Sequence, residues 1–331
     1  MKTPDLVPLL ASIAADLGIE MLVEPTWQRA AMLRFPNGKV RYLRMAVFDL
    51  NGAGATEIAK DKDWSAFFLA AHGYPVPKGR AFLAADFARR IEVDRGPTRA
   101  YDYARSLGWP VIIKPNSKSQ GHGVSLVDSR RDFFPAVRAA TKREDVFLVQ
   151  RLYEGEDYRV VLLDGELISA YRRLPLSVTG DGSSTTDQLL DAKQRTFDQE
   201  GRDTTIRVDD RRIDIMLRRV GLKRDSVVPQ GQTVTLLPNA NLSAGGDAVD
   251  VTNDVHHDWH QLCAHIAAAM NLRYIGIDLI TESPLKLPPT DYVVVEVNAA
   301  PGLDNYASVG PIQDAAVRQL YAAVLTALAA T

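Results

Sequence analysis

The sequence contains very little cysteine and no excess of one charge. Cys263 is the only cysteine in 331 residues, which excludes an intrachain disulfide and any zinc or iron–sulfur site built from several cysteines. Thirty-nine basic residues against 41 acidic ones give a formal net charge of −2. Bulk charge therefore excludes a strongly basic nucleic-acid binder and leaves open only a local basic site. We expect no nucleic-acid partner.

Long apolar runs and the common glycine motifs for nucleotides are also absent. No apolar stretch reaches the length of about 18 residues that a membrane-spanning helix needs, and Met1–Asp5 lacks the apolar core of a signal peptide. Neither GxxxxGK[ST] nor GxGxxG occurs, so the sequence contains no Walker A loop and no dinucleotide fingerprint. We expect a cytoplasmic protein without membrane contact.

The remaining composition is typical of a folded protein. Hydrophobic residues make up 46% and charged residues 24%, and at roughly 150 residues per domain the chain corresponds to about two domains. Helical and strand patterns follow one another without regular βαβ order, which predicts an α+β fold. Helices are expected at 6–17, 56–72, 97–108, 131–141, 187–199, 210–220, 255–270 and 313–330. Strands are expected at 19–23, 30–35, 40–45, 111–114, 124–127, 146–150, 158–163, 167–171, 274–280 and 292–298.

Oxygen-bearing side chains occur on the last two expected strands. In the strand 274–280, alternation places Asp278 on the face opposite Ile275, Ile277 and Leu279. In the strand 292–298, Glu296 and Asn298 share one face and the odd-numbered valines share the other. If the two strands pair, two carboxylates and an amide oxygen converge, a set that suits Mg²⁺ better than zinc. The alternative is the polar outer face of a half-exposed sheet.

A lysine and a glycine-rich loop follow the strand at 111–114. Lys114 ends this apolar strand, and residues 117–123 are small or polar, with glycines at 121 and 123. Small residues let backbone N–H groups close over an anion, and a lysine adds a point charge to phosphates. The alternative is a flexible hairpin with a surface lysine.

The strand at 146–150 leads into a polar, acidic segment. Backbone groups at the end of such a strand can read an adenine base, and Glu156 or Asp157 can bind the ribose hydroxyls. The alternative is a connector between domains.

Two further features have competing interpretations. His256 and His260 share a helical face, which allows a zinc site, but no HExxH is present and helix capping is the simpler interpretation. The expected helix 210–220 carries two pairs of arginines. They form either a solvated face or a site for an acidic substrate or a peptide carboxylate.

Several motifs are specific as a set and extend over roughly residues 56 to 310. They are Tyr74–Pro77, Gly155–Arg159, Val178–Gly182, Asn241–Asp250, Gly276–Asp278 and Glu296–Gly302. Together with the order of the lysines, the loop and the acidic strands, this set resembles the ATP-grasp superfamily of carboxylate–amine ligases. The resemblance is strongest to the ATP-grasp domain of the cyanophycin synthetases.

The resemblance implies an ATP-grasp fold, in which a nucleotide lies between two α+β subdomains, with a small N-terminal α/β segment added. It divides the chain into an N-terminal segment at 1–55, the N-terminal and lid subdomains at 56–148, and a nucleotide- and Mg²⁺-binding subdomain at 149–331.

The resemblance also implies site residues. The lysines would contact the phosphates, the glycine loop would form a mobile lid, residues 150–153 would line an adenine slot and Asp157 would hold the ribose. The implied nucleotide-binding residues are Lys62, Lys114, Ser119, Gly121, Gly123, Gln150, Arg151, Tyr153 and Asp157. The implied ligands of one or two Mg²⁺ ions, or of Mn²⁺, are Asp278, Glu296 and Asn298. The residues implied to face the acyl-phosphate are Arg172, Arg173, Asn241, Gly245 and Gly246. For the two arginines, surface solvation is the alternative.

By the same resemblance, the expected activity is ATP-dependent amide formation through an acyl-phosphate, on amino acids or small peptides. The alternatives are a ligase that modifies a protein or peptide tail and a nucleotide-binding module without turnover. A homodimer is compatible with the sequence.

Overall fold

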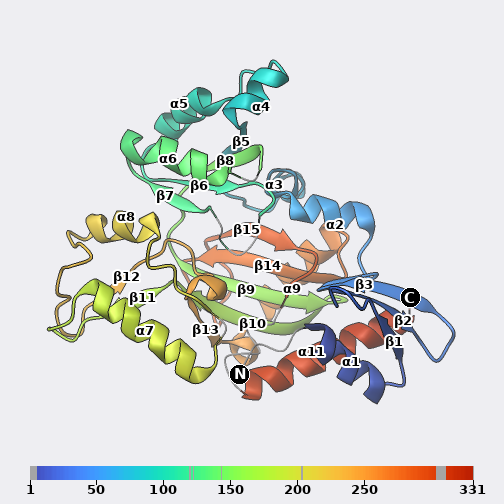
Figure 1. Ribbon diagram of the computed structural model, residues 1–331. Helices are drawn as coiled ribbons and strands as arrows, with labels where there is room; N and C mark the ends of the chain where they lie inside the picture. The colour runs from blue at the N-terminus through green and yellow to red at the C-terminus, as the bar shows by residue number, and fades with distance from the viewer. Residues whose placement is uncertain are drawn as a thin grey trace.

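A five-stranded antiparallel sheet forms the centre of the molecule (Figure 1). The computed structural model describes residues 6–118, 121, 123–142, 144–202, 204–302 and 311–330, so Ser119 lies outside the described residues. The sheet has the order β13-β10-β9-β14-β15. Its strands are β9 (Glu156–Leu163), β10 (Glu166–Leu174), β13 (Asp247–Asp250), β14 (Tyr274–Thr281) and β15 (Tyr292–Asn298).

The central sheet packs against a unit that is built from the N-terminal and C-terminal segments of the chain (Figure 1). Its elements are α1 (Leu6–Asp16), β1 (Glu20–Val23), β2 (Ala30–Arg34), β3 (Val40–Arg44), β4 (Val47–Phe48) and α11 (Pro311–Ala330). The β2–β3 hairpin turns at Asn37-Gly38 as expected, with Gly38 at a φ of 82°. Val161, Leu163 and Tyr171 of the central sheet pack into this core.

The face of the central sheet opposite Val161, Leu163 and Tyr171 packs against α9 (His257–Ala269). Ile275, Ile277 and Leu279 are fully buried there, together with Cys263 of the helix. Alternation along β14 therefore has the expected outcome, because the apolar side chains face the helix and Asp278 faces the other way. Two short 3₁₀ turns, η1 (Leu242–Ala244) and η2 (Thr252–Asp254), flank β13.

The expected single helix at 56–72 is wrong, because the chain forms α2 (Ala53–Lys60) and α3 (Lys62–Ala71). Asp61 separates them with an extended backbone (φ −97°, ψ 111°). Its carboxylate accepts hydrogen bonds from the backbone of Trp64 at 2.9 Å and from the side chain of Asn116 at 2.6 Å. A capping aspartate contributes about 1 kcal/mol to a helix, and the contact with Asn116 fixes the break in the tertiary structure.

A second sheet, with the order β5-β8-β6-β7, lies above the central sheet in Figure 1. The β5–β8 unit contains β5 (Gly79–Leu83), α4 (Ala85–Arg90), α5 (Pro97–Leu107), β6 (Val111–Pro115), β7 (Ser125–Val127), α6 (Arg130–Ala140) and β8 (Val146–Arg151). Helices α5 and α6 bury Phe133 and Phe147 against one face of its sheet. The sequence patterns did not predict β5 or α4.

A third group of elements lies at the left of Figure 1 and has its own core around Leu190, Ile213 and Leu236. This α7–β12 unit consists of β11 (Ser177–Thr179), α7 (Thr186–Glu200), α8 (Arg211–Arg219) and β12 (Thr233–Thr235). Thr185 and Gln188 form a capping box at the start of α7, which explains where this helix begins. Among the described residues, no helix combines the length and apolarity that crossing a membrane requires.

Candidate functional site

The pairing of β14 with β15 brings the predicted metal ligands together. Asp278 lies opposite Glu296, and Gly276 lies opposite Asn298. The register shifts directly after Asp278, so that Leu279 pairs with Val294. A β-bulge inserts one extra residue and turns the strand. The expectation that the odd-numbered valines share one face is therefore wrong, since Val294 and Val297 are the valines that join the core beside α9.

Two arginines hold the buried carboxylate of Asp278. Arg159 lies opposite Asp278 on β9 and donates to it from Nε at 2.6 Å and from Nη2 at 2.7 Å. Arg173 of β10 lies 3.0 Å from the same carboxylate and donates to Asp157 from Nε at 2.8 Å and from Nη2 at 2.6 Å. Three neighbouring strands thus contribute alternating charges to one face of the sheet.

Sequence reasoning did not assign a role to Arg159. The available signal was alternation, because Asp157 and Arg159 share a face of β9 while Tyr158 and Val160 pack into the core beside α9. The same alternation separates the two candidate arginines of β10. Arg172 pairs with Glu156, away from Asp278, so the structure brings only Arg173 to the acidic centre.

Burial and neighbouring charges shift the pKa values of Asp278 and Asp157 in opposite directions. Burial acts to raise the pKa of Asp278, but the charges and hydrogen bonds of Arg159 and Arg173 outweigh it and hold this pKa at about 2. Burial raises the pKa of Asp157 to about 6; the neighbouring charge of Asp278 adds to this effect and Arg173 opposes it. Asp278 therefore stays ionised over a wider pH range than Asp157.

Both predicted phosphate-binding lysines lie beside these carboxylates. Burial lowers the pKa of Lys114 to about 8; the charge of Glu296 opposes this effect and that of Lys62 adds to it. Lys62 lies 3.3 Å from Glu296 and donates to the carbonyl of Lys118 at 2.7 Å. The break at Asp61 makes Lys62 the first residue of α3, which places its side chain next to β15.

Asn298 has an unsatisfied polar atom in this centre. Its Nδ2 is buried and has no hydrogen-bond partner in the part of the chain that the structure describes. Buried polar groups without a partner are rare, and because Nδ2 is a donor, the partner that it lacks would be an acceptor such as a phosphate oxygen rather than a cation. The described residues contain no group of three or more His, Cys, Asp or Glu side chains that could hold a metal ion. The set of two carboxylates and one amide nevertheless fits Mg²⁺, which retains waters and phosphate oxygens as further ligands.

The residues predicted for the adenine slot lie around the end of β8. Gln150 is buried and pairs with Gly79 of β5, where an added Cβ would lie 2.4 Å from the Gln150 side chain. The Arg151 guanidinium lies 5.9 Å from the centre of the Tyr153 ring. The backbone of Lys78 donates to the Tyr153 hydroxyl at 3.2 Å. Because β8 pairs with β6, this group shares a sheet with Lys114.

The glycine loop approaches the segment 239–246. An added Cβ on Gly121 would lie 2.3 Å from Asn239 Nδ2 and 2.7 Å from Asn241 Oδ1, so a larger residue does not fit. A Cβ on Gly246 would lie 2.5 Å from the carbonyl of Leu174. The structure therefore brings together two predicted groups, the glycine loop and the Asn241 loop, that are about 120 residues apart.

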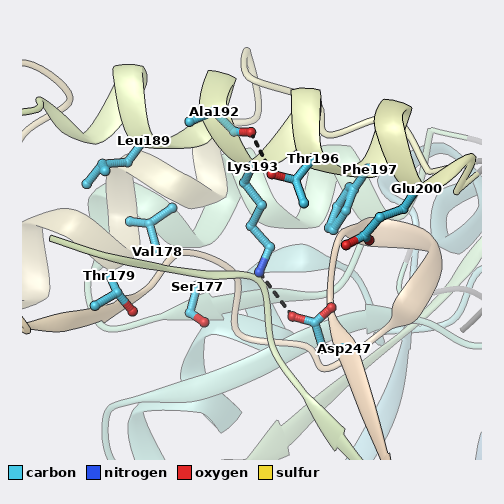
Figure 2. A pocket seen from close by; sticks show the side chains of 10 residues that line it. All are labelled: Ser177, Val178, Thr179, Leu189, Ala192, Lys193, Thr196, Phe197, Glu200 and Asp247. Carbon is cyan, nitrogen blue, oxygen red and sulfur yellow. Dashed lines mark hydrogen bonds and ion pairs between the residues drawn. The ribbon is translucent and has the colours of Figure 1, made fainter. Parts of the chain in front are cut away.

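A cavity of about 410 Å³ lies under α7 and is bounded by β11 and Asp247 (Figure 2). Lys193 points into it and pairs with Asp247 at 3.0 Å, as Figure 2 shows. Arg202 also pairs with Asp247, at 2.7 Å, and donates to the carbonyl of Gly246. Arg202, held by the same Asp247 that pairs with Lys193, thus supports the loop that carries Gly245 and Gly246.

His256, His260 and the last two arginines of the arginine-rich helix make structural contacts. His256 caps α9 by accepting from the backbone of Asp258 at 3.2 Å, and His260 contacts the Asp164–Gly165 turn through the Gly165 carbonyl. On α8, Arg218 pairs with Asp132 at 3.1 Å and Arg219 pairs with Asp128 at 3.4 Å. Helix α8 therefore joins the α7–β12 unit to the β5–β8 unit.

Comparison with known proteins agrees with this architecture. Residues 225–318 match the family model described as a RimK-like ATP-grasp domain. A cyanophycin synthetase from Geminocystis herdmanii is 34% identical over 260 residues, which are 76% of this chain and 28% of that protein. A glutathione biosynthesis bifunctional protein from Streptococcus mutans is 33% identical over 64% of this chain and 28% of that protein. The chain thus spans less than a third of the length of these relatives.

A solved structure shows the same fold. The bifunctional glutathione synthetase from Pasteurella multocida aligns with a TM-score of 0.56 and 23% identity, covering 95% of this chain and 44% of that one. The paired antiparallel sheets with their helices agree with these similarities. The acidic strands β14 and β15 agree with them as well. The chain carries an ATP-grasp domain, and its fold is α+β, as the motifs predicted.

Proposed function

We propose that the protein is an ATP-dependent carboxylate–amine ligase that forms amide bonds on amino acids or small peptides through an acyl-phosphate. The observation that carries this proposal is the meeting of Lys62 and Lys114 with Asp278 and Glu296. Two lysines can bind the phosphates of a nucleotide, and two carboxylates beside them can bind the divalent cation that accompanies those phosphates. Phosphoryl transfer depends mainly on positioning and on neutralisation of charge.

The lysines supply fixed positive charge for the phosphates, and their partial burial strengthens each contact. Asp278, Glu296 and Asn298 would hold Mg²⁺, which when bound neutralises the phosphate oxygens that face it. Arg159 and Arg173 keep Asp278 ionised and fixed in orientation. Glu296 lies directly opposite Asp278, just before the register of the two strands shifts.

The reaction balances in two steps. A substrate carboxylate oxygen attacks the γ-phosphorus of ATP, the bond to the β–γ bridging oxygen breaks, and ADP leaves. The amine nitrogen then attacks the acyl carbon, phosphate leaves and the ammonium proton passes to solvent. Arg173 and the Asn241–Gly246 loop would stabilise the negative charge that develops on the acyl oxygen.

The nucleotide would lie between the two sheets. Gln150, Arg151 and Tyr153 would line the adenine slot, and the loop with Ser119, Gly121 and Gly123 would cover the phosphates and exclude water. Asp157 was assigned to the ribose from the sequence. Its pairing with Arg173 favours a place in the acidic centre instead.

The test is release of ADP over a panel of amino acids, dipeptides and polyamines, with mass spectrometry of the products. We expect ADP release that depends on one carboxylate and one amine, and a product mass equal to their sum less one water. Modification of a peptide tail alone would favour the peptide-ligase alternative. ATP binding without ADP release under any condition would favour a binding module and contradict the proposal.

A further inference from the structure

A relay of hydrogen bonds connects α8 with the Asn241 loop. Arg212 Nη1 donates to Asn239 Oδ1 at 3.2 Å, and Asn239 Nδ2 donates to Asn241 Oδ1 at 3.0 Å. Asn241 is one of the residues that the proposed function places beside the acyl-phosphate, and the inference rests on that function. Arg212 was considered from the sequence only as part of a basic helix face.

The relay has a direction, because the three side chains differ in what they can donate. A guanidinium donates only, so Arg212 requires an oxygen of Asn239 to face it. The amide nitrogen of Asn239 then faces Asn241 and requires the oxygen of that side chain. The Nδ2 of Asn241 remains as a donor, and none of the described residues accepts a hydrogen bond from it.

Arg212 is itself held in one orientation. Its guanidinium binds Asp210 through Nη2 at 2.6 Å and through Nε at 3.0 Å, and Nη1 also donates to the carbonyls of Gly121 at 3.0 Å and Val124 at 3.1 Å. Only 18% of the side chain is exposed. A lysine keeps the charge but lacks the planar group that makes these contacts at once.

We propose that Arg212 is a positioning residue that acts through Asn239 to keep the Nδ2 of Asn241 available as a hydrogen-bond donor to the oxyanion formed on the substrate acyl group. With the opposite orientation, the oxygen of Asn241 would face the developing negative charge and repel it. The relay therefore selects which end of this amide takes part in the reaction.

The test uses Asn239→Asp, which keeps the acceptor for Arg212 and removes the donor to Asn241. The introduced carboxylate then attracts Asn241 Nδ2 and reverses its amide. We expect kcat for amide formation to fall by about tenfold, less than the roughly 100-fold fall expected for Asn241→Ala. The KM for ATP should stay unchanged. In an Asn241→Ala background, Asn239→Asp should change kcat by less than about twofold, because the group it acts on is gone.

Arg212→Lys should lower kcat at least as much as Asn239→Asp, because it also loses the contacts with the carbonyls of Gly121 and Val124. The matched control Arg218→Lys on the same helix should retain wild-type kcat. Equal fold-losses from Asn239→Asp in both backgrounds would overturn the relay, since they would show an effect independent of Asn241.

A second readout needs no turnover, so it separates the relay from the ligase function. In protein labelled with ¹⁵N-asparagine, the Asn241 side-chain amide signal is assigned by its loss in Asn241→Ala. It should shift in Asn239→Asp and in Arg212→Lys but not in Arg218→Lys. An unshifted signal in correctly folded variants contradicts the relay, whether or not the wild type releases ADP.

Discussion

Arg159 holds Asp278 through two parallel hydrogen bonds of 2.6 and 2.7 Å, across the pairing of β9 with β14. This paired geometry is the strongest form of an arginine–carboxylate contact. It fixes the carboxylate that the proposed function assigns to the metal, and it makes the acidic centre depend on a residue of a different strand.

Replacing Arg159 with methionine should destabilise the fold. The buried Asp278 would lose one of its two positive partners, and breaking a buried pair costs about 3 kcal/mol. Urea unfolding of both proteins at pH 7 measures the difference. As a control, Arg89→Met removes an exposed pair with Asp86 and should change stability by less than about 1 kcal/mol. Equal effects of the two substitutions would contradict this assignment.

Stability should depend on pH in two separate windows. The pKa of Asp278 is lowered to about 2, so its contribution is present above pH 4 and is lost as pH falls towards 2. The pKa of Asp157 is raised to about 6, so its contribution is present below pH 4 and is lost as pH rises through 6. Asp157→Asn should therefore gain stability relative to the wild type between pH 4 and 6. Urea midpoints across this range test the sign; a constant difference between the two proteins argues against it.

Glu296→Gln should weaken binding of the divalent cation without disturbing the fold, because the shape of the side chain is kept and its charge is lost. Binding of Mn²⁺ in the presence of a non-hydrolysable ATP analogue, measured by water proton relaxation, gives a readout besides activity. Amide formation should be abolished. Glu282→Gln, an exposed neighbour of β14, serves as the control. Wild-type Mn²⁺ affinity in Glu296→Gln would remove this residue from the metal site.

Lys114→Met should lower the affinity for ATP by roughly 10- to 100-fold, since a hydrogen bond to a charged group contributes about 1.5–3 kcal/mol. The pKa of Lys114 is lowered to about 8, so in the wild type ATP affinity should fall as pH rises through 8. Calorimetry between pH 7 and 9 should show this fall in the wild type and a flat response in Lys114→Met. The exposed Lys60→Met is the control; the same pH response in Lys114→Met as in the wild type would exclude the phosphate role.

Gly121→Ala should uncouple the two half-reactions. Gly121 has a φ of 67°, and the added methyl would meet Asn239 and Asn241. A displaced loop would leave the acyl-phosphate open to water, so more ADP should be released per amide formed. Adding Gly123→Ala, at a φ of 74°, should increase this ratio further. ADP and amide are measured in one reaction.

The control for this experiment is Gly38→Ala, which has a similarly positive φ of 82° in the β2–β3 turn and open space around it. It should cost similar backbone strain and leave the ratio unchanged. A wild-type ratio in folded Gly121→Ala would mean that the loop does not shield the intermediate.

Local patterns were sufficient for much of the fold and for part of the site. Alternation placed Asp278 and Glu296 on their faces, and strand pairing then brought them opposite each other. The single helix expected at 56–72 is two helices in the structure. Local patterns do not predict the break because it depends on the contact between Asp61 and Asn116, which are 55 residues apart. Short-range propensity contains no information on such a contact.

The sequence by itself determined which chemical groups are present and, along regular strands such as β9, β10 and β14, which face carries them, because periodicity and motif spacing are local properties. The tertiary structure alone decided which charges meet. Arg159 and Asp278 are 119 residues apart, and only the order of strands in the sheet makes them neighbours. The same order brings Arg173 to Asp278, whereas alternation along β10 turns the adjacent Arg172 towards Glu156. Strand order and register are long-range properties, and they turn scattered carboxylates, lysines and arginines into a single charged centre.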